Sequence, residues 1–416
     1  EDIEQFGPGD VSQILQQMGG LLVSYSYLGA SVQLQGLEPE HALILIDGQR
    51  VLGAKDGVID LSRLSLANIE RIEIVKGPSS ILYGSNAMGG VINIITKTAQ
   101  EPLFVETNLI YGGLAQQAEL STGARGERGE ILATVNVRNQ EHFDLDESDL
   151  DFTGPQLQQV NGNIKGSFYL TDDTKLTGDA GYSVVNLMRQ SSNAAGAEFV
   201  QKNMTEDIRV RLNSTSVMEQ AQLKFNLRGS SYKDQYLLDQ KNSDYLDDFQ
   251  VTEQALFFAG VQHDYIGESH TITTGAEGFF ETLSSDRLKD YSSERYRPAF
   301  FIQDQWSYQD VLTLNGGARV EYDSWFGAYP SPKVSGRYVL TPSLSVTGSY
   351  GLGYRAPSFK EMFLLFENTG VGYVVSGNPD LLPERLRGSN VGINFSPIPL
   401  IRFRGNLYHN NLTNLI

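Results

Sequence analysis

The feature that most constrains this chain is a strict alternation of apolar and polar residues, which begins near Glu101 and continues to the end of the sequence. Segments of about ten residues repeat it, as in Ile131–Arg138, Gly162–Leu170, Val217–Arg228 and Ile401–Tyr408. Because successive side chains of a strand point to opposite faces, each segment predicts a β-strand with one apolar and one polar face. The pattern predicts about 15 such strands.

The connections between these segments alternate between short turns and long loops. Short turns are expected near 126–129, 171–173, 266–269, 307–310, 340–343 and 396–399, and long loops near 141–156, 187–204, 234–248, 284–295, 323–331 and 356–384. Short turns at one end and long loops at the other are typical of outer-membrane β-barrels. A soluble sandwich or propeller also alternates, but it has shorter strands and no systematic difference between its two ends.

Composition fits this interpretation and excludes several other classes. No apolar run approaches the roughly 18 residues of a transmembrane helix, whereas a barrel needs an apolar residue only at every second position. The absence of cysteine excludes disulfide scaffolds, Cys-type zinc sites and iron–sulfur clusters. The net charge of −18 disfavours a nucleic-acid partner. No catalytic motif is present, so we do not expect an enzyme.

Residues 1–98 follow a different pattern and predict a small α/β domain. Asp10 can cap a short helix over Val11–Met18, which ends at Gly19 and Gly20. Strand-like runs follow at Ser31–Gln35, Ala42–Ile46, Arg71–Val75 and Val91–Thr96. We therefore divide the chain into a domain of residues 1–98 and a β-domain of residues 99–416.

Several motifs resemble those of TonB-dependent outer-membrane receptors. In the first domain they are the stretches 42–48, 69–80, 82–85 and 88–96, and in the second domain 353–361 and 377–384. The resemblance implies a mainly β fold, with an N-terminal α/β plug domain inside a 22-stranded antiparallel transmembrane β-barrel. Since the chain starts at Glu1 without Met and stops at Ile416 in a strand-like segment, we interpret it as a fragment. We expect it to lack the extreme N-terminus with the TonB box and roughly seven C-terminal strands, and not to form a closed pore.

The resemblance also implies a function. It implies active import of a scarce nutrient chelate across a Gram-negative outer membrane, driven by the TonB–ExbB–ExbD complex, with outer-membrane lipid around the barrel and no required cofactor. A ferric siderophore is the first choice of ligand, followed by cobalamin and haem. No histidine lies between Pro357 and Asn378, which disfavours haem. A passive porin-like or adhesive barrel, and a soluble secreted glycan-binding β-protein, remain alternatives.

The matched positions suggest which residues contact the substrate. In the plug the candidates form two apical loops, Tyr25, Ser26, Tyr27 and Leu28 in the first, and Arg50, Leu52, Lys55 and Asp56 in the second. In the longest barrel loop they are Phe366, Tyr373 and Asn378. Tyrosine combines a flat apolar face with a polar tip, which suits chelates and corrin-like rings.

Two further groups of charged residues have expected roles. The resemblance implies that Arg71 and Lys76 of the plug pair with barrel glutamates, of which Glu384 is one, and so dock the plug reversibly. The acidic stretch 141–151 has Asp-x-Asp spacing that can supply oxygen ligands to Ca²⁺. The candidate calcium ligands are Asp144, Asp146, Asp149 and Asp151. His41, which directly precedes a strand, is expected to be structural.

Overall fold

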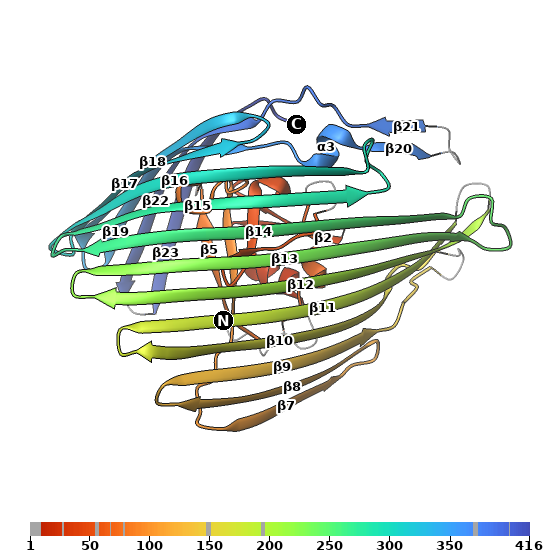
Figure 1. Ribbon diagram of the computed structural model, residues 1–416, viewed down its shortest axis with the longest axis horizontal. Helices are drawn as coiled ribbons and strands as arrows, with labels where there is room; N and C mark the ends of the chain where they lie inside the picture. Colours follow the sequence, from red (N-terminus) through yellow and green to blue (C-terminus); the bar gives the residue numbers. More distant parts are fainter. Residues whose placement is uncertain are drawn as a thin grey trace.

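The plug and the barrel strands form one open, curved assembly in the computed structural model (Figure 1). The structure describes residues 10–26, 29–54, 58–66, 68–77, 80–146, 151–192, 196–368, 373–398 and 400–416. Among these residues, one antiparallel sheet of fifteen strands curves around a small α/β unit that precedes it in the chain. The predicted combination of an α/β plug with a large antiparallel barrel sheet is confirmed.

The plug is built around a four-stranded sheet in the order β4-β3-β6-β5. Its elements are α1 (Val11–Gln17), β1 (Leu21–Ser26), β2 (Gly29–Leu34), η2 (Pro39–His41), β3 (Ala42–Ile46), β4 (Gln49–Arg50), η3 (Leu61–Arg63), β5 (Ile69–Lys76), α2 (Ser80–Tyr83) and β6 (Gly90–Thr96). Asp10 caps α1 by accepting a hydrogen bond from the Ser12 backbone N–H, as its position predicts. Helix α1, hairpin β1–β2 and the sheet share one apolar core that includes Leu15, Leu34 and Ile92.

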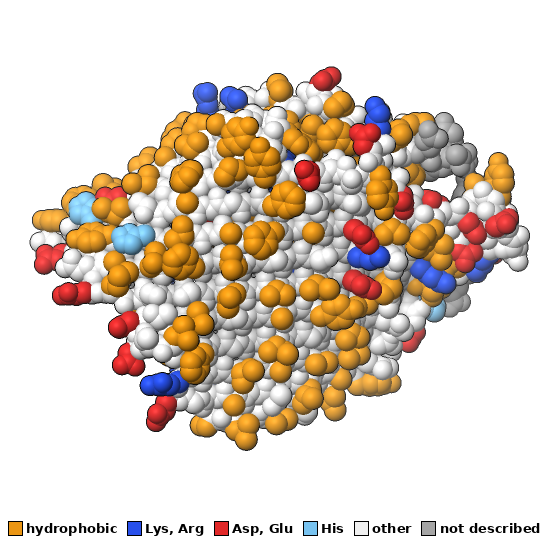
Figure 2. All heavy atoms as spheres, viewed as in Figure 1, with side chains coloured by type: hydrophobic (Ala, Val, Ile, Leu, Met, Phe, Trp, Pro, Cys, Tyr) orange, Lys and Arg blue, Asp and Glu red, His pale blue; other side chains and the backbone are white. Residues whose placement is uncertain are grey.

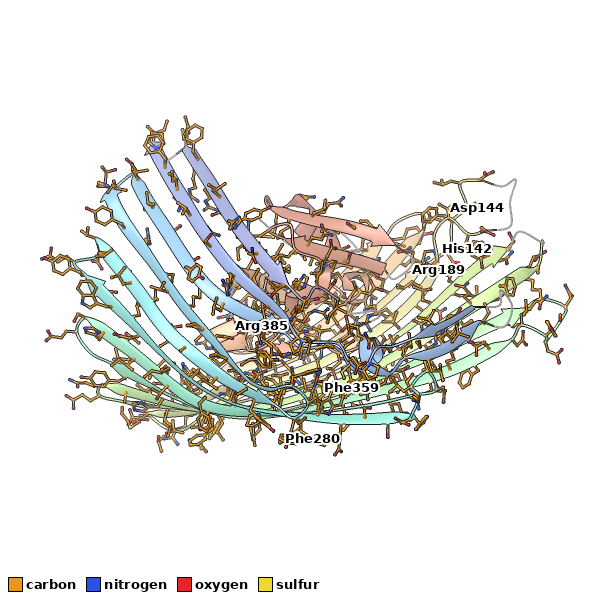
Figure 3. The ribbon with its side chains drawn as sticks, turned by 90° about the horizontal axis from the view of Figure 1, so that it is seen from above. His142, Asp144, Arg189, Phe280, Phe359 and Arg385 are labelled. Carbon is orange, nitrogen blue, oxygen red and sulfur yellow. The ribbon has the colours of Figure 1, made fainter. Side chains whose placement is uncertain are left out.

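The barrel strands follow one another around the sheet, each pairing with its neighbour in sequence apart from one insertion between β19 and β22. They are β7 (Phe104–Tyr111), β8 (Ala115–Gly126), β9 (Gly129–Gln140), β10 (Gln156–Thr171), β11 (Thr174–Ser192), β12 (Glu198–Met218), β13 (Ala221–Gln240), β14 (Asp248–Ile266), β15 (His270–Ser285), β16 (Ser292–Tyr308), β17 (Leu312–Asp323), β18 (Gly327–Thr341), β19 (Leu344–Arg355), β22 (Glu384–Ile398) and β23 (Ile401–Thr413). Strands β7 and β23 form the two edges of the described sheet. The sheet is therefore a trough, and the plug lies in its concave side (Figure 3).

The two faces of the sheet have opposite chemistry. The convex face carries a band of exposed apolar side chains with charged groups towards both ends (Figure 2), and Phe225, Phe257, Phe300 and Val334 are among its members. The next residues in sequence point into the concave side, where Phe258 and Phe301 line a cavity together with plug residues. This arrangement is what the alternation predicts for a barrel wall with lipid on one face.

The structure corrects several predicted boundaries. The loops expected at 187–204 and 234–248 are much shorter, because β11, β12 and β13 continue to Ser192, from Glu198 and to Gln240. Strand β12 has 21 residues, about twice the number needed to cross a bilayer. The added residues of these strands are largely polar and pair with the neighbouring strand, so no alternation of apolar residues marks them as strand.

Two hairpins also differ from the predictions. Val217–Arg228 is not one strand, since β12 ends at Met218 and β13 begins at Ala221. The two turn residues between them are polar and do not visibly interrupt the pattern. In the plug, hairpin β1–β2 was not predicted; β1 contains Tyr25 and Ser26, which were expected in a loop.

The longest loop, between β19 and β22, has its own secondary structure. It contains α3 (Phe359–Phe363), β20 (Leu365–Asn368) and β21 (Tyr373–Ser376), with a capping box between Ser358 and Glu361. It lies at the end of the sheet where the longer loops gather (Figure 1). None of the helices that the structure describes is long and apolar enough to cross a membrane.

Candidate functional site

The residues predicted to contact substrate do not all face the same space. Tyr25 is 58% exposed at the end of β1, and its hydroxyl lies 3.1 Å from Ser12 Oγ. Ser26 is the last residue of β1. Tyr27, Leu28, Lys55 and Asp56 lie outside the described residues.

Arg50 and Leu52 are placed between the plug and the barrel wall rather than at an outer surface. Arg50 donates hydrogen bonds to the carbonyls of Tyr83 at 2.8 Å and Ser85 at 3.0 Å, and its guanidinium lies over the Phe279 ring. Burial, with a smaller effect from nearby Arg297, lowers the pKa of Arg50 to about 10. Leu52 is buried in an apolar cluster of barrel side chains. Both residues hold the plug in place in this conformation.

Of the barrel-loop candidates, Phe366 lies against a cation of a neighbouring loop. Arg287, in the β15–β16 loop, lies 4.5 Å from the centroid of the Phe366 ring and 5.9 Å from that of Tyr236. The Arg287 carbonyl accepts a hydrogen bond from the Leu365 backbone N–H at 2.7 Å, which ties the longest loop to this position. Tyr373 begins β21. Asn378 is exposed, and its side chain accepts from the Asp380 backbone N–H at 3.0 Å.

Glu384 contacts the plug through a residue other than the two that were expected to pair with it. Arg71 is 53% exposed and pairs with Glu70 and Glu73 of its own strand, and Lys76 donates to the Gly19 carbonyl. Neither reaches Glu384, because both project from the exposed edge strand β5. His41 instead meets the fully buried Glu384, with 2.5 Å between Nε2 and Oε2.

The same carboxylate connects the plug to the longest loop. Glu384 accepts from Arg355 Nη2 at 2.8 Å, and Arg355 also contacts Glu361 at 3.0 Å. Glu361 is the capping-box residue of α3. His41 therefore joins the plug to the barrel, and a structural role for it stays a prediction.

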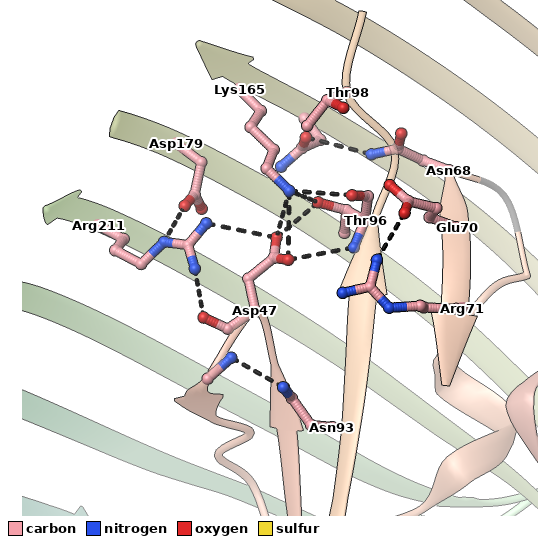
Figure 4. A network of polar contacts seen from close by, with 12 residues as sticks. Asp47, Asn68, Glu70, Arg71, Asn93, Thr96, Thr98, Lys165, Asp179 and Arg211 are labelled. Atoms are coloured by element: carbon pink, nitrogen blue, oxygen red, sulfur yellow. Dashed lines mark hydrogen bonds and ion pairs between the residues drawn. The ribbon is translucent and has the colours of Figure 1, made fainter. Parts of the chain in front are cut away.

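A second docking point is the turn between β3 and β4 (Figure 4). Asp47 and Gly48 have φ values of 48° and 78°, as a two-residue hairpin turn of type I′ requires. Lys165 lies 3.3 Å from the Asp47 carboxylate and Arg211 lies 3.5 Å from it. Three barrel strands thus contribute cations to this turn, since Arg211 also donates to the Asp47 carbonyl and Arg228 to the Gly48 carbonyl.

A third docking point surrounds Gly84 and Ser85, which follow α2. Arg297 Nη1 donates to Ser85 Oγ at 2.5 Å and also pairs with Glu281 at 3.2 Å. Gly84 has φ of 73°, and a Cβ there would lie 2.7 Å from Glu321 Oε2. Glu321 in turn accepts from Arg319 and from the Tyr354 hydroxyl. Glycine is therefore required at this close approach.

The acidic loop gives no assembled cation site in its described part. Asp144 Oδ1 accepts from the Asp146 backbone N–H at 3.0 Å and from Thr153 Oγ1 at 3.2 Å. Asp151 Oδ1 accepts a hydrogen bond of 2.6 Å from the Ser192 backbone N–H at the end of β11. Asp149 lies outside the described residues. The described residues contain no group of three His, Asp or Glu side chains that could hold a metal ion, so calcium binding stays a prediction.

Sequence reasoning missed the barrel cations that hold the plug. Lys165, Arg211 and Arg228 each occupy polar positions of alternating strands. That pattern predicts that they face the concave side, but not which plug residue they meet. Tyr232 and Tyr354 are also buried, Tyr232 in the cluster that contains Leu52 of the plug.

The fold and these docking points define a class: a β-barrel of the outer-membrane type that carries a folded plug on its inner side. The sequence profile described as "TonB dependent receptor-like, beta-barrel" matches residues 117–416, and that of the "TonB-dependent Receptor Plug Domain" matches residues 1–91. The chain belongs to the TonB-dependent receptor family, whose place is the Gram-negative outer membrane.

Similar proteins include transporters and receptors of this family. The chain is 28% identical over 415 residues to an iron-regulated outer membrane virulence protein of Vibrio cholerae, covering 95% of this chain and 62% of that protein. It is 25% identical over 432 residues to the vitamin B12 transporter BtuB of Vibrio vulnificus, covering 100% of this chain and 66% of the transporter. The chain thus spans less than two thirds of the length of these curated relatives.

Solved structures share the fold at lower sequence identity. A variant of the ferric enterobactin receptor of Pseudomonas aeruginosa superposes with a TM-score of 0.79 at 18% identity, covering 97% of this chain and 69% of that one. The siderophore receptor PirA of the same organism gives 0.77 at 21% identity, with 99% and 72% covered.

Proposed function

We propose that this chain is part of a receptor that actively imports a scarce nutrient chelate across the outer membrane, with energy from a TonB–ExbB–ExbD complex. A plug that fills the concave side of the sheet and is attached at a few separate polar points carries this proposal. A porin needs an open lumen, whereas a gated importer needs a plug that is held firmly and can be released.

A ferric siderophore is our first choice of ligand. The relative that matches most of the chain at 28% identity is described as iron-regulated. Siderophore complexes are commonly anionic, and the described outer mouth presents Arg287 against two aromatic rings. Such a cation next to aromatic faces suits an anionic chelate with aromatic groups.

Cobalamin is the second candidate, because the vitamin B12 transporter aligns with the whole chain. Haem ranks third. The proposed function involves binding and gating without covalent chemistry, so it assigns no enzymatic activity. A calcium ion bound by the loop that contains Asp144 and Asp146 is a separate proposal, and calcium titration monitored by the exchange of that loop's amides tests it.

Uptake by whole cells tests the main proposal. The receptor is produced in a host that lacks its own receptors for the probes, and uptake of ⁵⁵Fe-enterobactin and of ⁵⁷Co-cyanocobalamin is compared with and without tonB. We expect TonB-dependent accumulation of the iron probe and surface binding of it in both hosts. Uptake that does not depend on TonB would favour a passive barrel, and absence of binding and uptake of every chelate would overturn the proposal.

A further inference from the structure

Two cavities lie between the plug and the barrel wall, and the Asp47–Gly48 turn separates them. The first has a volume of about 110 Å³ and borders strands β9 to β12. The second has a volume of about 280 Å³ and borders strands β13 to β16. Asp47 lines the first, Gly48 lines the second, and Gln49 lines both. The hairpin is therefore the wall that the two cavities share.

The linings of both cavities combine polar groups with apolar side chains. The barrel contributes amide and hydroxyl groups to the first, which include Asn136, Asn161, Asn163, Ser183 and Thr205, and the plug contributes apolar residues such as Ile46, Ile69 and Ile94. The second combines Gln262, Gln303 and Arg228 with the rings of Phe258 and Phe279. A few polar groups that converge among aromatic side chains are typical of sites for small molecules.

The size of the cavities argues that the turn must move for a chelate to pass. Sites for ligands of drug size usually enclose about 300–1,000 Å³. Both cavities fall below that range. If the turn were displaced, the two would merge into one continuous space along the wall.

The contacts of the turn show that the barrel holds it there. The Asp47 carboxylate accepts a hydrogen bond from Thr96 Oγ1 of the same plug sheet at 2.5 Å, so contacts within the plug already orient the side chain towards the barrel cations. Lys165 bridges the same group and the Thr96 carbonyl, the latter at 2.9 Å. Arg211 and Arg228 bind the two backbone carbonyls of the turn. Asp47 is the one carboxylate of the turn that faces these cations, and Asp179 is paired with Arg211 from the barrel side.

We propose that the substrate passes between the plug and the wall formed by β9 to β16, and that the Asp47–Gly48 turn is the barrier in that passage. The proposal rests on the importer function proposed above and adds its route. Lys165, Arg211 and Arg228 keep the barrier closed in the resting receptor. Loss of the Asp47 charge removes the attraction on which two of these cations depend and opens the route.

Cysteine labelling tests the barrier directly, because the chain has no cysteine of its own. Ser230 is buried in the wall of the second cavity, and its neighbour Ser231 is exposed on the opposite face. The receptor with Ser230→Cys is purified in detergent and treated with a polar maleimide. We expect Asp47→Asn to raise the labelling rate at this position on the order of tenfold, the effect of weakening one buried charge contact by about 1.4 kcal/mol.

Matched variants separate this effect from general loosening. The labelling rate of Ser231→Cys should not change with Asp47→Asn. Glu73→Gln removes an exposed plug carboxylate that pairs with Arg71 at 2.9 Å, and it should leave the labelling of Ser230→Cys unchanged. An unchanged rate at Ser230→Cys in folded Asp47→Asn receptor overturns the proposal, and so does an equal rise in the Glu73→Gln background.

A reversible covalent lock provides a second test. Gln49 Nε2 donates to Ser230 Oγ at 2.6 Å, so Gln49→Cys and Ser230→Cys can be bridged by a short bis-methanethiosulfonate, which a reductant cleaves again. Bridging should abolish uptake of ⁵⁵Fe-enterobactin while surface binding remains, and cleavage of the bridge in the same double variant should restore the uptake measured before bridging. Normal uptake through the bridged receptor overturns the route. Failure of every variant and of the wild type to accumulate any chelate instead contradicts the importer function, and the labelling rates still decide whether the turn is a barrier.

Discussion

Glu384→Gln tests whether one buried carboxylate holds the plug to the barrel. Glu384 is fully buried at the start of β22, where it accepts from Arg355 of the barrel and meets His41 of the plug. Glutamine keeps the shape of the side chain and removes its charge. His41 then loses its charged partner, while Arg355 retains Glu361.

The expected loss follows from the burial of both partners. Removing the charge weakens the hydrogen bonds that Glu384 makes with His41 and Arg355, and a hydrogen bond to a charged group contributes about 1.5–3 kcal/mol. Two such contacts are weakened, while Arg355 keeps a second carboxylate and glutamine can still hydrogen-bond, so we expect a loss of about 3 kcal/mol. This corresponds to opening of the plug segment around His41 that is on the order of 100-fold more frequent.

Native-state hydrogen exchange of the receptor in detergent measures that opening. Amides of β3 and of η2, which contain or adjoin His41, should exchange faster in Glu384→Gln, and those of β12 and β13 should not. Glu253→Gln is the control, since Glu253 pairs with Lys233 on the exposed face and should not affect the plug. Equal protection of β3 in the variant and the wild type would refute the reasoning, as would uniform loss of protection throughout the barrel.

Three further predictions concern the plug. Gly84→Ala places a Cβ next to Glu321 at a positive φ, and we expect a loss of about 1–2 kcal/mol or more in the urea-induced unfolding of the plug, whereas Gly126→Ala, with open space around it, should have little effect. Leu52→Ala leaves a cavity in the cluster between plug and barrel and should cost about 2–4 kcal/mol in the same assay. Burial raises the pKa of Asp10, so protonation of this carboxyl favours the folded plug. Relative to Asp10→Asn, the wild type should gain stability as the pH falls through that raised pKa towards 3.8. Urea midpoints of the wild type and of Asp10→Asn that change in parallel with pH would contradict this prediction.

The sequence predicted those elements that are determined by residues close together in the chain. The predicted strand Ala42–Ile46 has the same bounds in the structure. A run of five apolar residues is the length of a strand and is too short for a typical buried helix. Asp10 caps α1 for the same kind of reason, since the capping bond spans two residues. The strand extensions, such as Glu198–Thr205, were missed because their pairing depends on the neighbouring strand and not on an apolar face.

The docking contacts lay beyond prediction because they depend on how the plug is oriented in the barrel. Alternation places Lys165 and Arg211 on the inner face, but Lys165 meets a carboxylate 118 residues away in sequence. Rotation of the plug by one strand would bring other cations to Asp47 without changing any local pattern. The resemblance to the family suggested that Glu384 pairs with Arg71 and Lys76, but these two residues lie on the exposed edge of the plug sheet, and Glu384 contacts His41.

The docking points differ in how easily water can replace a broken contact, and this difference favours opening of the plug on one side. At Glu384 and at Gly84 the contacting groups are almost completely buried, so no water can replace a broken contact without a larger displacement. At the Asp47–Gly48 turn Asp47 borders the first cavity and Arg228 borders the second, and water in those cavities can solvate these two groups as their contacts break. The cost of separating the charges is therefore lower at the turn than at Glu384. A plug pulled from the periplasmic side should release first along β10 to β13 and stay attached near β22, so that it swings open about one side and can close again without refolding.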